Sequence, residues 1–468
     1  MDMSTEEFRR TAHQAVDWMA DYLETIRERP VLPPMQPGDL IDALPAHAPE
    51  RGEPMAEILA DFERLIPPAM THWNHPRFFA YFAISGSGPG IIAEMLTAAM
   101  NSNGMVWKSG PAITELEQVT LGWLREWLGL PPEFFGIIYD TASISTMHAI
   151  AAARELADPE ARKRGGRGDL VLYTSEQSHS SVDKGAIAIG IGQDNVRHVP
   201  VNDRFEMKPD ALREMIEADL HAGRKPFCVV ATVGTTSTTS IDPVEQIADI
   251  AEQHGLWLHV DGAYGGIAAI LPEMHDLLGP ARRAHSLVTN PHKWMLTPVD
   301  CSVFYTRRPD ILRRAFSLVP EYLHTAEHPR AANLMDYGVQ LGRRFRALKL
   351  WFVMRYFGRE GLAETLRAHM AIAQRFAELV RADARFEVVA PVCFSVVCFR
   401  YRGSDEENRA LIEQINARTD SFLSHTVLNG RYVVRLAIGH ARTTWEDVQP
   451  VWETMASFAE AREAAAGR

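Results

Sequence analysis

The sequence predicts an α/β fold with a mostly parallel central sheet and helices on both faces, and three observations indicate it. From about residue 86 to 305, short apolar runs alternate with helical stretches, as expected when crossover helices connect parallel strands. The runs are apolar nearly throughout, which is typical of strands buried on both faces. Five of them end in small, polar or ionisable residues, at the edge where an open α/β sheet binds ligands.

The N-terminal segment is expected to form a helix at residues 5–28, followed by an extended, proline-rich connection at 30–37. Such an arm has little core of its own and needs a second surface to bury its apolar face. We therefore separate residues 1–85, a helical arm, from a large α/β domain at residues 86–350.

Residues 351–468 are expected to form a small α+β domain. Helices are predicted from about 338 to 382 and from about 443 to 464. Between them, residues 386–389, 395–400 and 432–437 are predicted to be antiparallel strands, because they are short and rich in β-branched and aromatic residues.

Composition excludes several functions. The 468 residues include 48 basic and 60 acidic ones, a net charge of −12, so nothing favours binding to nucleic acid or an anionic membrane. The four cysteines show no metal-like spacing and suit a reducing cytoplasm. The N-terminus is typical of an amphipathic helix and not of a signal peptide, and no apolar run reaches membrane length.

A lysine that is a candidate reactive residue follows the apolar run 286–289. It lies in Asn290-Pro291-His292-Lys293-Trp294, where a strand end can present its amine to a carbonyl cofactor. Imine formation requires a desolvated amine with a lowered pKa. Taken alone, Lys293 is more often a solvated surface lysine.

A carboxylate follows the preceding apolar run, residues 255–260. Asp261 lies 293 − 261 = 32 residues before Lys293, which leaves room for a helix and another strand. A carboxylate at that strand end can keep the pyridine nitrogen of pyridoxal phosphate protonated, which makes the ring a better electron sink. The alternative is an aspartate that caps a helix or a turn.

Two further strand ends carry candidate groups. Thr141, Ala142 and Ser143 follow the run 136–139 and begin a helix, where backbone amides and hydroxyls can hold a phosphate. His179 follows the run 170–173 and could stack on a cofactor ring and exchange protons with a substrate. The alternatives are an ordinary helix cap and a structural histidine. A further run, 227–233, ends in the small polar turn 234–240.

The order of these groups, and further motifs, resemble the group II pyridoxal-phosphate-dependent amino-acid decarboxylases, most closely the aromatic-L-amino-acid decarboxylases. The resemblance covers about residues 5–460. It is carried by residues 72–82 (HWNHPRFFAYF), 114–117 (TELE), 178–182 (SHSSV), 233–236 (VGTT), 259–264 (HVDGAY), 290–294 (NPHKW) and 341–346 (LGRRFR).

The resemblance implies a fold type I, PLP-dependent transferase-like architecture with pyridoxal 5′-phosphate bound in the large domain. Lys293 matches the lysine that bonds the cofactor, Asp261 the partner of the pyridine nitrogen and His179 the stacked histidine. The implied phosphate and ring contacts are Thr141, Ala142, Ser143, Thr236, Ala263, Asn290 and His292. The resemblance also implies a homodimer with shared active sites.

Tyr322 matches the tyrosine of a catalytic loop that returns a proton to the substrate carbon after carbon dioxide leaves. Relatives that release aldehydes carry phenylalanine there. The hydroxyl therefore favours an amine as product, because a carbanion without a proton donor persists long enough to meet oxygen.

The implied substrate pocket is aromatic, with Trp73, Tyr81 and Phe82 as walls and Gly342 nearby. Asn103 and Met105 match residues contributed by the partner subunit. Ile84 replaces a residue that often donates a hydrogen bond to a ring hydroxyl, and Gly342 replaces the serine of relatives selective for phenols. We therefore expect tryptophan or phenylalanine to be favoured over tyrosine or dihydroxyphenylalanine.

Two departures from the family pattern affect the site. Asp140 stands where many relatives have glycine, and a carboxylate beside a phosphate is unfavourable unless its side chain points away. The segment from Tyr322 to Leu341 is shorter than in animal relatives, which would change how a lid closes.

Three functions stay open on the sequence. The first is decarboxylation of an aromatic L-amino acid to its amine. The second is an aromatic aldehyde synthase, or a decarboxylase for other substrates such as glutamate or histidine. The third is a non-enzymatic scaffold, against which the retained Lys293, Asp261 and His179 argue.

Overall fold

The structure is a computed structural model that describes residues 2–318 and 332–466. The chain divides into two compact units. The smaller comprises Met1–Ala83 and Arg400–Arg468, and the larger comprises Ile84–Phe399. The three-part division expected from the sequence, with boundaries at residues 85 and 350, stays a prediction.

The larger unit is built on a seven-stranded sheet in the order β2-β8-β7-β6-β5-β3-β4. Its strands are β2 (Phe135–Tyr139), β3 (Leu170–Ser175), β4 (Val196–Val199), β5 (Lys225–Thr232), β6 (Trp257–Asp261), β7 (Ser286–Thr289) and β8 (Ser302–Thr306). The strands from β7 to β4 are parallel, whereas β8 runs antiparallel to both β7 and β2. The predicted α/β class with a mostly parallel sheet is confirmed.

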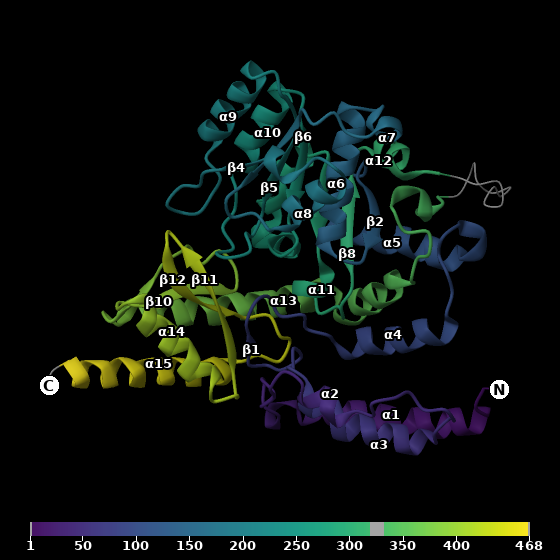
Figure 1. Cartoon of the computed structure of the whole chain (residues 1–468), viewed down its shortest axis with the longest axis vertical. Helices are drawn as coiled ribbons and strands as arrows, with labels where there is room; N and C mark the ends of the chain where they lie inside the picture. The colour runs from purple at the N-terminus through teal and green to yellow at the C-terminus, as the bar shows by residue number, and fades with distance from the viewer. Residues whose placement is uncertain (1, 319–331, 467–468) are drawn as a thin grey trace. The chain divides into compact units, whose positions relative to one another are not determined.

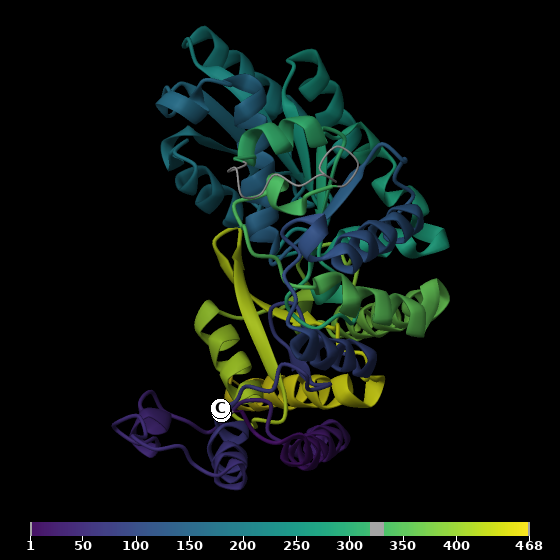
Figure 2. The ribbon, with the colours of Figure 1, turned by 90° about the vertical axis from the view of Figure 1, so that its right-hand side faces the viewer.

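Helices cover both faces of this sheet (Figure 1, Figure 2). The helices of the larger unit are α4 (Gly88–Met100), α5 (Pro111–Trp127), α6 (Ala142–Ala157), α7 (Ala161–Arg164), α8 (Ser181–Ala188), α9 (Pro209–His221), α10 (Val244–Gln253), α11 (Pro291–Trp294), α12 (Pro309–Phe316) and α13 (Arg346–Ala382). Burial shows why the β5 run is apolar without alternation: the consecutive residues Cys228, Val229, Val230 and Ala231 are all fully buried.

The core on one face of the sheet forms between α6 and the strands. Ala149 and Ile150 of α6 pack in one cluster with Leu172 of β3, Val230 of β5 and Phe304 of β8. This packing holds the N-terminal end of α6 against the sheet edge at which the five predicted strand ends meet.

One predicted element begins later than expected. Helix α13 starts at Arg346 and not near 338, and its helical geometry is interrupted at Gly358 (φ 64°). The chain before it is held in a non-helical path by polar contacts, because Val339 N–H donates to His148 Nε2 at 3.1 Å and Arg343 N–H donates to Asn103 Oδ1 at 2.9 Å. Tertiary hydrogen bonds thus override the local helical pattern at residues 338–345.

Strands β9 (Phe386–Val388) and β10 (Val396–Tyr401) follow α13, close to the predicted positions. Short 3-10 helices lie at Ile26–Glu28, Pro67–Ala69, Trp107–Ser109, Gln193–Asn195, Gly265–Ile270, Pro272–Leu278, Pro280–Arg283 and Leu334–Tyr337.

The smaller unit combines N-terminal helices with C-terminal strands and helices. Its elements are α1 (Thr5–Glu24), α2 (Asp39–Ala43), α3 (Met55–Leu65), β1 (Phe78–Phe79), α14 (Asp405–Asn416), β11 (Phe422–Leu428), β12 (Arg431–Ala437) and α15 (Trp445–Ala466). Strand β1 pairs in parallel with β11, which forms an antiparallel hairpin with β12. Asn429 and Gly430 turn this hairpin with φ of 50° and 74°, the left-handed conformations that these residue types adopt most easily.

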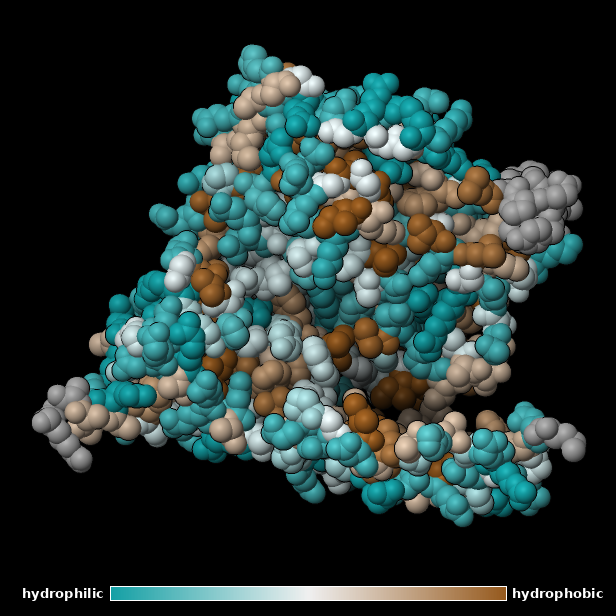
Figure 3. All heavy atoms as spheres, in the orientation of Figure 1, coloured by the Kyte–Doolittle hydropathy of each residue, from teal (hydrophilic) through white to brown (hydrophobic). Residues whose placement is uncertain are grey.

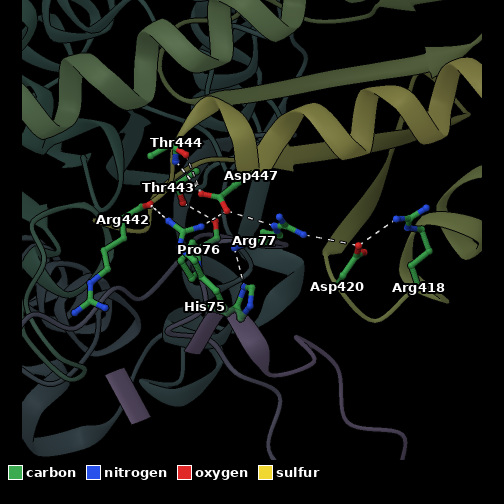
Figure 4. Close-up of polar contacts among 10 residues, drawn as sticks. His75, Pro76, Arg77, Arg418, Asp420, Arg442, Thr443, Thr444 and Asp447 are labelled. Atoms are coloured by element: carbon green, nitrogen blue, oxygen red, sulfur yellow. Dashed lines mark hydrogen bonds and ion pairs between the residues drawn. The ribbon is translucent and has the colours of Figure 1, made fainter. Parts of the chain in front are cut away.

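A buried carboxylate links the two sequence segments of the smaller unit (Figure 4). Asp447 on α15 forms ion pairs with Arg27 and, at 3.3 Å, with Arg77, and its side chain is only 1% exposed. It also accepts a hydrogen bond from Thr444 N–H at 2.9 Å. Through these contacts Asp447 ties residues near the N-terminus to the last helix. Within the described residues, no helix is long and apolar enough to cross a membrane.

Candidate active site

The site lies where β2, β3, β5, β6 and β7 end. Because β8 is antiparallel to both β2 and β7, those two strands run in the same direction as the rest. The residue pairs Thr232–Asp261 and Asp261–Val288 are in register across β5, β6 and β7. The predicted convergence of five strand ends at one edge is therefore confirmed.

Lys293 is held on a single helical turn directly after β7. Pro291 begins α11, and the neighbouring side chains anchor the turn on both sides. Trp294 is buried, stacks on Tyr264 with ring centroids 4.8 Å apart and donates its indole N–H to His369 Nδ1 at 3.0 Å. The lysine backbone is consequently rigid while its side chain projects at the sheet edge.

The Lys293 amine is electrostatically suited to act as a nucleophile. Burial lowers its pKa below the ordinary 10.5, and the negative charge of Asp261 opposes that shift. An amine with a lowered pKa is more often uncharged at neutral pH, and only the uncharged form attacks a carbonyl.

Asp261 ends β6 and is 5% exposed. Its Oδ1 accepts the backbone N–H of Ala263 at 3.0 Å, which fixes the orientation of the carboxylate. Since Asp261 interacts electrostatically with both Lys293 and His179, the structure brings together the three residues that the sequence predicted to share one site.

His179 precedes α8 and is exposed at the sheet edge. Its Nδ1 accepts the backbone N–H of Ser181 at 3.1 Å, so the proton of the neutral ring lies on Nε2. Partial burial and the charge of Lys293 lower the pKa of His179, whereas Asp261 raises it. The ring is therefore neutral at neutral pH.

The turn after β2 carries the predicted phosphate contacts. Thr141 is the N-cap residue of α6, but its side chain makes no capping hydrogen bond. The Asp140 carboxylate accepts hydrogen bonds from Thr141 N–H and Oγ1–H at 2.5 and 3.1 Å, and from Gln340 Nε2 at 2.9 Å. Ala142 and Ser143, in the first turn of α6, are partly exposed.

Asn290 and His292 flank this region from the β7 side. Asn290 is 1% exposed, and its side-chain Oδ1 is buried without a hydrogen-bond partner among the described residues. His292 Nδ1 accepts the backbone N–H of Cys301 at 2.8 Å, so Nε2 carries the ring proton and can donate it. Burial and the charge of Lys293 lower the pKa of His292 to about 4.

The turn after β5 requires glycine at a close backbone approach. Gly234 has φ of 91°, and a Cβ there would lie 2.9 Å from the backbone nitrogen of Gly265. The same turn places Thr236 at the surface, while Ala263 is buried beside Asp261. Their predicted contacts with the cofactor stay predictions.

The predicted substrate contacts lie in both units. In the smaller unit, Trp73 stacks on Phe78 at 4.3 Å and on Tyr81 at 5.6 Å, and the Arg435 guanidinium lies 5.4 Å from the Phe82 ring. Tyr81 is 51% exposed, so it has surface to offer a ligand.

In the larger unit, Asn103 lies beside Gly342, where a Cβ would be 3.6 Å from Asn103 Nδ2. Met105 packs against Val106 and Met335. Tyr322 lies outside the described residues. The roles of all these residues stay predictions.

One supporting pair was missed by reasoning from the sequence. Glu117 of α5 and Arg343 are 1% and 6% exposed at their side chains and form an ion pair at 2.8 Å. Both also bind the backbone of Ile138 in β2, through its N–H at 2.9 Å and its carbonyl at 2.8 Å. The two residues belong to the motifs 114–117 and 341–346, but nothing in the sequence pattern indicates that they pair.

The residues present fit pyridoxal 5′-phosphate. A nucleophilic lysine and a fixed carboxylate suit its aldehyde and its ring nitrogen. The buried Asn290 Oδ1 lacks a hydrogen-bond partner among the described residues, and a half-turn of the amide would present Nδ2 donors to a phosphate. His292 Nε2 and the α6 amides offer further donors.

Comparisons with known proteins show the family to which the chain belongs. Residues 37–402 match the family model described as the pyridoxal-dependent decarboxylase conserved domain. The chain is 40% identical over 475 residues to the aromatic-L-amino-acid decarboxylase of Mus musculus, covering 98% of each protein.

Solved structures are similar over nearly the whole chain. One is Oryza sativa TDC with PLP and tryptamine, with a TM-score of 0.95 and 36% identity over 99% of both chains. Another is Rhodiola rosea 4-hydroxyphenylacetaldehyde synthase, with a TM-score of 0.91 and 34% identity over 98% of this chain and 99% of the other. The chain therefore belongs to the pyridoxal-dependent decarboxylase family.

Proposed function

We propose that the protein is a PLP-dependent carboxy-lyase that converts an aromatic L-amino acid into the corresponding arylalkylamine and carbon dioxide. The observation that carries the proposal is the buried Lys293 amine, with its lowered pKa, in electrostatic contact with Asp261 and His179. Relatives named for aromatic amino-acid decarboxylation match almost the full length of the chain.

Each residue has a defined part in this proposal. Lys293 holds the cofactor covalently, Asp261 keeps a proton on its ring nitrogen, and His179 lies against the ring. Ala142, Ser143, Asn290 and His292 hold the phosphate. When bound, pyridoxal 5′-phosphate supplies the π system that takes up the electron pair left by the departing carboxylate.

The predicted side-chain pocket favours an aromatic substrate without a ring hydroxyl. Trp73, Tyr81 and Phe82 are proposed to contact the substrate ring. Neither Ile84 nor Gly342 has a side chain that can form a hydrogen bond to a phenol. We propose tryptophan or phenylalanine as the preferred substrate, with tyrosine and dihydroxyphenylalanine accepted less well.

The direct test incubates the purified, PLP-loaded protein separately with tryptophan, phenylalanine, tyrosine, dihydroxyphenylalanine, glutamate and histidine. Amine and carbon dioxide should form in equal amounts from an aromatic substrate, and most efficiently from tryptophan or phenylalanine. Turnover of glutamate or histidine alone would contradict the aromatic assignment.

An aldehyde synthase is the second candidate, because a solved structure with that activity is similar over nearly the whole chain. The two outcomes differ in products: oxidative deamination consumes oxygen and releases aldehyde, ammonia and hydrogen peroxide. Measuring these together with the amine separates the candidates. Tyr322 supports the amine.

We also propose that the protein is a homodimer, which the exposed apolar residues of α4 support. Ile92, Met95, Leu96 and Met100 are between 40% and 53% exposed. Apolar side chains also reach the surface in Figure 3, and α1 has no buried residue. Leu96→Glu should shift the mass measured by light scattering to that of a monomer, whereas Val427→Glu, at a residue 60% exposed elsewhere, should not.

A cytoplasmic location is part of the proposal. It rests on the four cysteines, all of which are free thiols and three of which are buried.

A further inference from the structure

Asp140 makes more contacts than a turn residue requires. One carboxylate oxygen accepts hydrogen bonds from the N–H and the hydroxyl of Thr141, at 2.5 and 3.1 Å. The other oxygen accepts a hydrogen bond from Gln340 Nε2 at 2.9 Å, across 200 residues of sequence. The carboxylate is therefore directed to the side of the turn and not over the first amides of α6.

These contacts decide what Thr141 can do. Its hydroxyl proton is donated to Asp140, and its side chain makes no capping hydrogen bond to α6. The same proton cannot be donated to a phosphate. Asp140 thus fixes the backbone at Thr141 through these hydrogen bonds. Ala142 and Ser143, whose amides begin the helix, follow directly.

The hydrogen bond from Gln340 joins Asp140 to the segment that leads to Gly342. This segment is fixed at three more points: Tyr139 donates its hydroxyl to Tyr337 O, Val339 N–H donates to His148 Nε2, and Arg343 pairs with Glu117. Of these contacts, only the hydrogen bond between Gln340 and Asp140 joins the segment to the phosphate turn itself.

We propose that Asp140 is a positioning residue that presets the turn Thr141–Ser143 for the cofactor phosphate by tying it to Gln340. The proposal rests on the proposed function, since it assumes that the phosphate lies at the start of α6. The negative charge of the Asp140 carboxylate opposes phosphate binding. The hydrogen bonds of Asp140 favour binding, because they already order the turn and so reduce the conformational entropy that it loses when the phosphate binds.

Two variants separate charge from hydrogen bonding. Asp140→Asn removes the charge but keeps the contacts, because Oδ1 can still accept from Thr141 and Nδ2 can donate to Gln340 Oε1 after a half-turn of the Gln340 amide. Asp140→Ala removes both charge and contacts. Since the charge is absent in each, a difference between the two variants measures the hydrogen bonds alone.

The measurement titrates cofactor-free protein with PLP and with pyridoxal, which lacks the phosphate, and follows protein fluorescence. The Ala variant should bind PLP about fivefold or more weakly than the Asn variant, as expected for lost hydrogen bonds. Pyridoxal should bind both equally. Gln340→Ala should weaken PLP binding in the wild-type background but add nothing in the Asp140→Ala protein.

Equal PLP affinity of the Asn and Ala variants would overturn the proposal, as would an equal loss for pyridoxal, which would indicate general loosening. Thermal unfolding of each cofactor-free variant shows whether it is folded. If the wild-type protein binds no PLP, the proposed function fails; if it binds PLP and the variants do not differ, only the role of Asp140 fails.

Discussion

Lys293 illustrates how neighbours create a reactive group from a common residue. Its sequence position at the end of an apolar run is unremarkable, yet burial lowers its pKa and the carboxylate of Asp261 retains part of the charge. The balance matters, since a fully charged amine cannot attack and an amine without a nearby carboxylate would stay poorly solvated.

Replacing Lys293 by alanine should abolish both turnover and covalent attachment of PLP, because Lys293 is the buried amine that interacts with Asp261. Borohydride reduction of the loaded wild-type protein, followed by peptide mapping, should place the label on Lys293. Lys163→Ala is the matched control, because this lysine is 78% exposed at its side chain and pairs only weakly with Glu160 at 3.7 Å. Label on another lysine would refute the assignment.

Tyr322→Phe should shift product from amine toward aldehyde, because the substrate carbanion would lose its proton donor and react with oxygen. The ratio of aldehyde to amine, measured with hydrogen peroxide, reports the change. Tyr322→Phe protein that makes only amine at the wild-type rate would show that another group supplies the proton.

At the scale of elements, β2 and α5 are joined through the buried Glu117–Arg343 pair. Both side chains bind the backbone of Ile138 as well as each other. A charge inside a protein is costly unless it is paired and hydrogen-bonded, so each partner depends on the other. This pair fixes the strand that leads into the phosphate turn and the segment that leads into α13.

Arg343→Met should lower the free energy of unfolding by about 3–5 kcal/mol, because Glu117 would be left as a buried, unpaired charge. Asp210→Asn breaks the exposed Arg213–Asp210 pair and should cost at most about 1 kcal/mol. Chemical denaturation of both variants provides the comparison. Similar small losses in both would mean that the buried pair adds little net stability.

At the scale of the whole molecule, buried histidines should make the protein sensitive to acid. Burial lowers the pKa of five histidines from 6.5 to about 4. They are His75, His148, His259, His285 and His292. Above pH 6.5 these rings are neutral in both folded and unfolded chains. Between 6.5 and about 4 only the unfolded chain takes up the protons, so stability falls as the pH falls.

The free energy of unfolding should therefore decrease steadily from pH 7 to pH 5. His148→Gln removes one such proton and should reduce the slope by up to about 1.4 kcal/mol per pH unit below pH 6, and by less nearer pH 7. His198→Gln is a control, since the His198 side chain is 45% exposed. A flat stability profile from pH 7 to pH 5 would contradict this account.

The sequence predicted the sheet and its strand ends better than it predicted the bounds of some helices. Lys293, Asp261 and His179 were predicted to share one site from the order of their strand ends taken together, because a parallel sheet sends every such end to one edge. The start of α13 was predicted too early, since the helical pattern near 338 gives no sign of the hydrogen bonds to His148 and Asn103. Gln340 was not singled out for the same reason.

Apolar runs, their spacing and the residues that end them were enough to determine the sheet, its helices and the set of residues at its edge, because burial and crossover connections follow from local pattern. Only the tertiary structure decided which polar groups meet. It showed that the Asp140 carboxylate accepts hydrogen bonds from Thr141 and Gln340 and that Arg343 pairs with Glu117. Hydrogen bonds between residues 200 and more apart depend on how elements pack, and no local pattern encodes that distance.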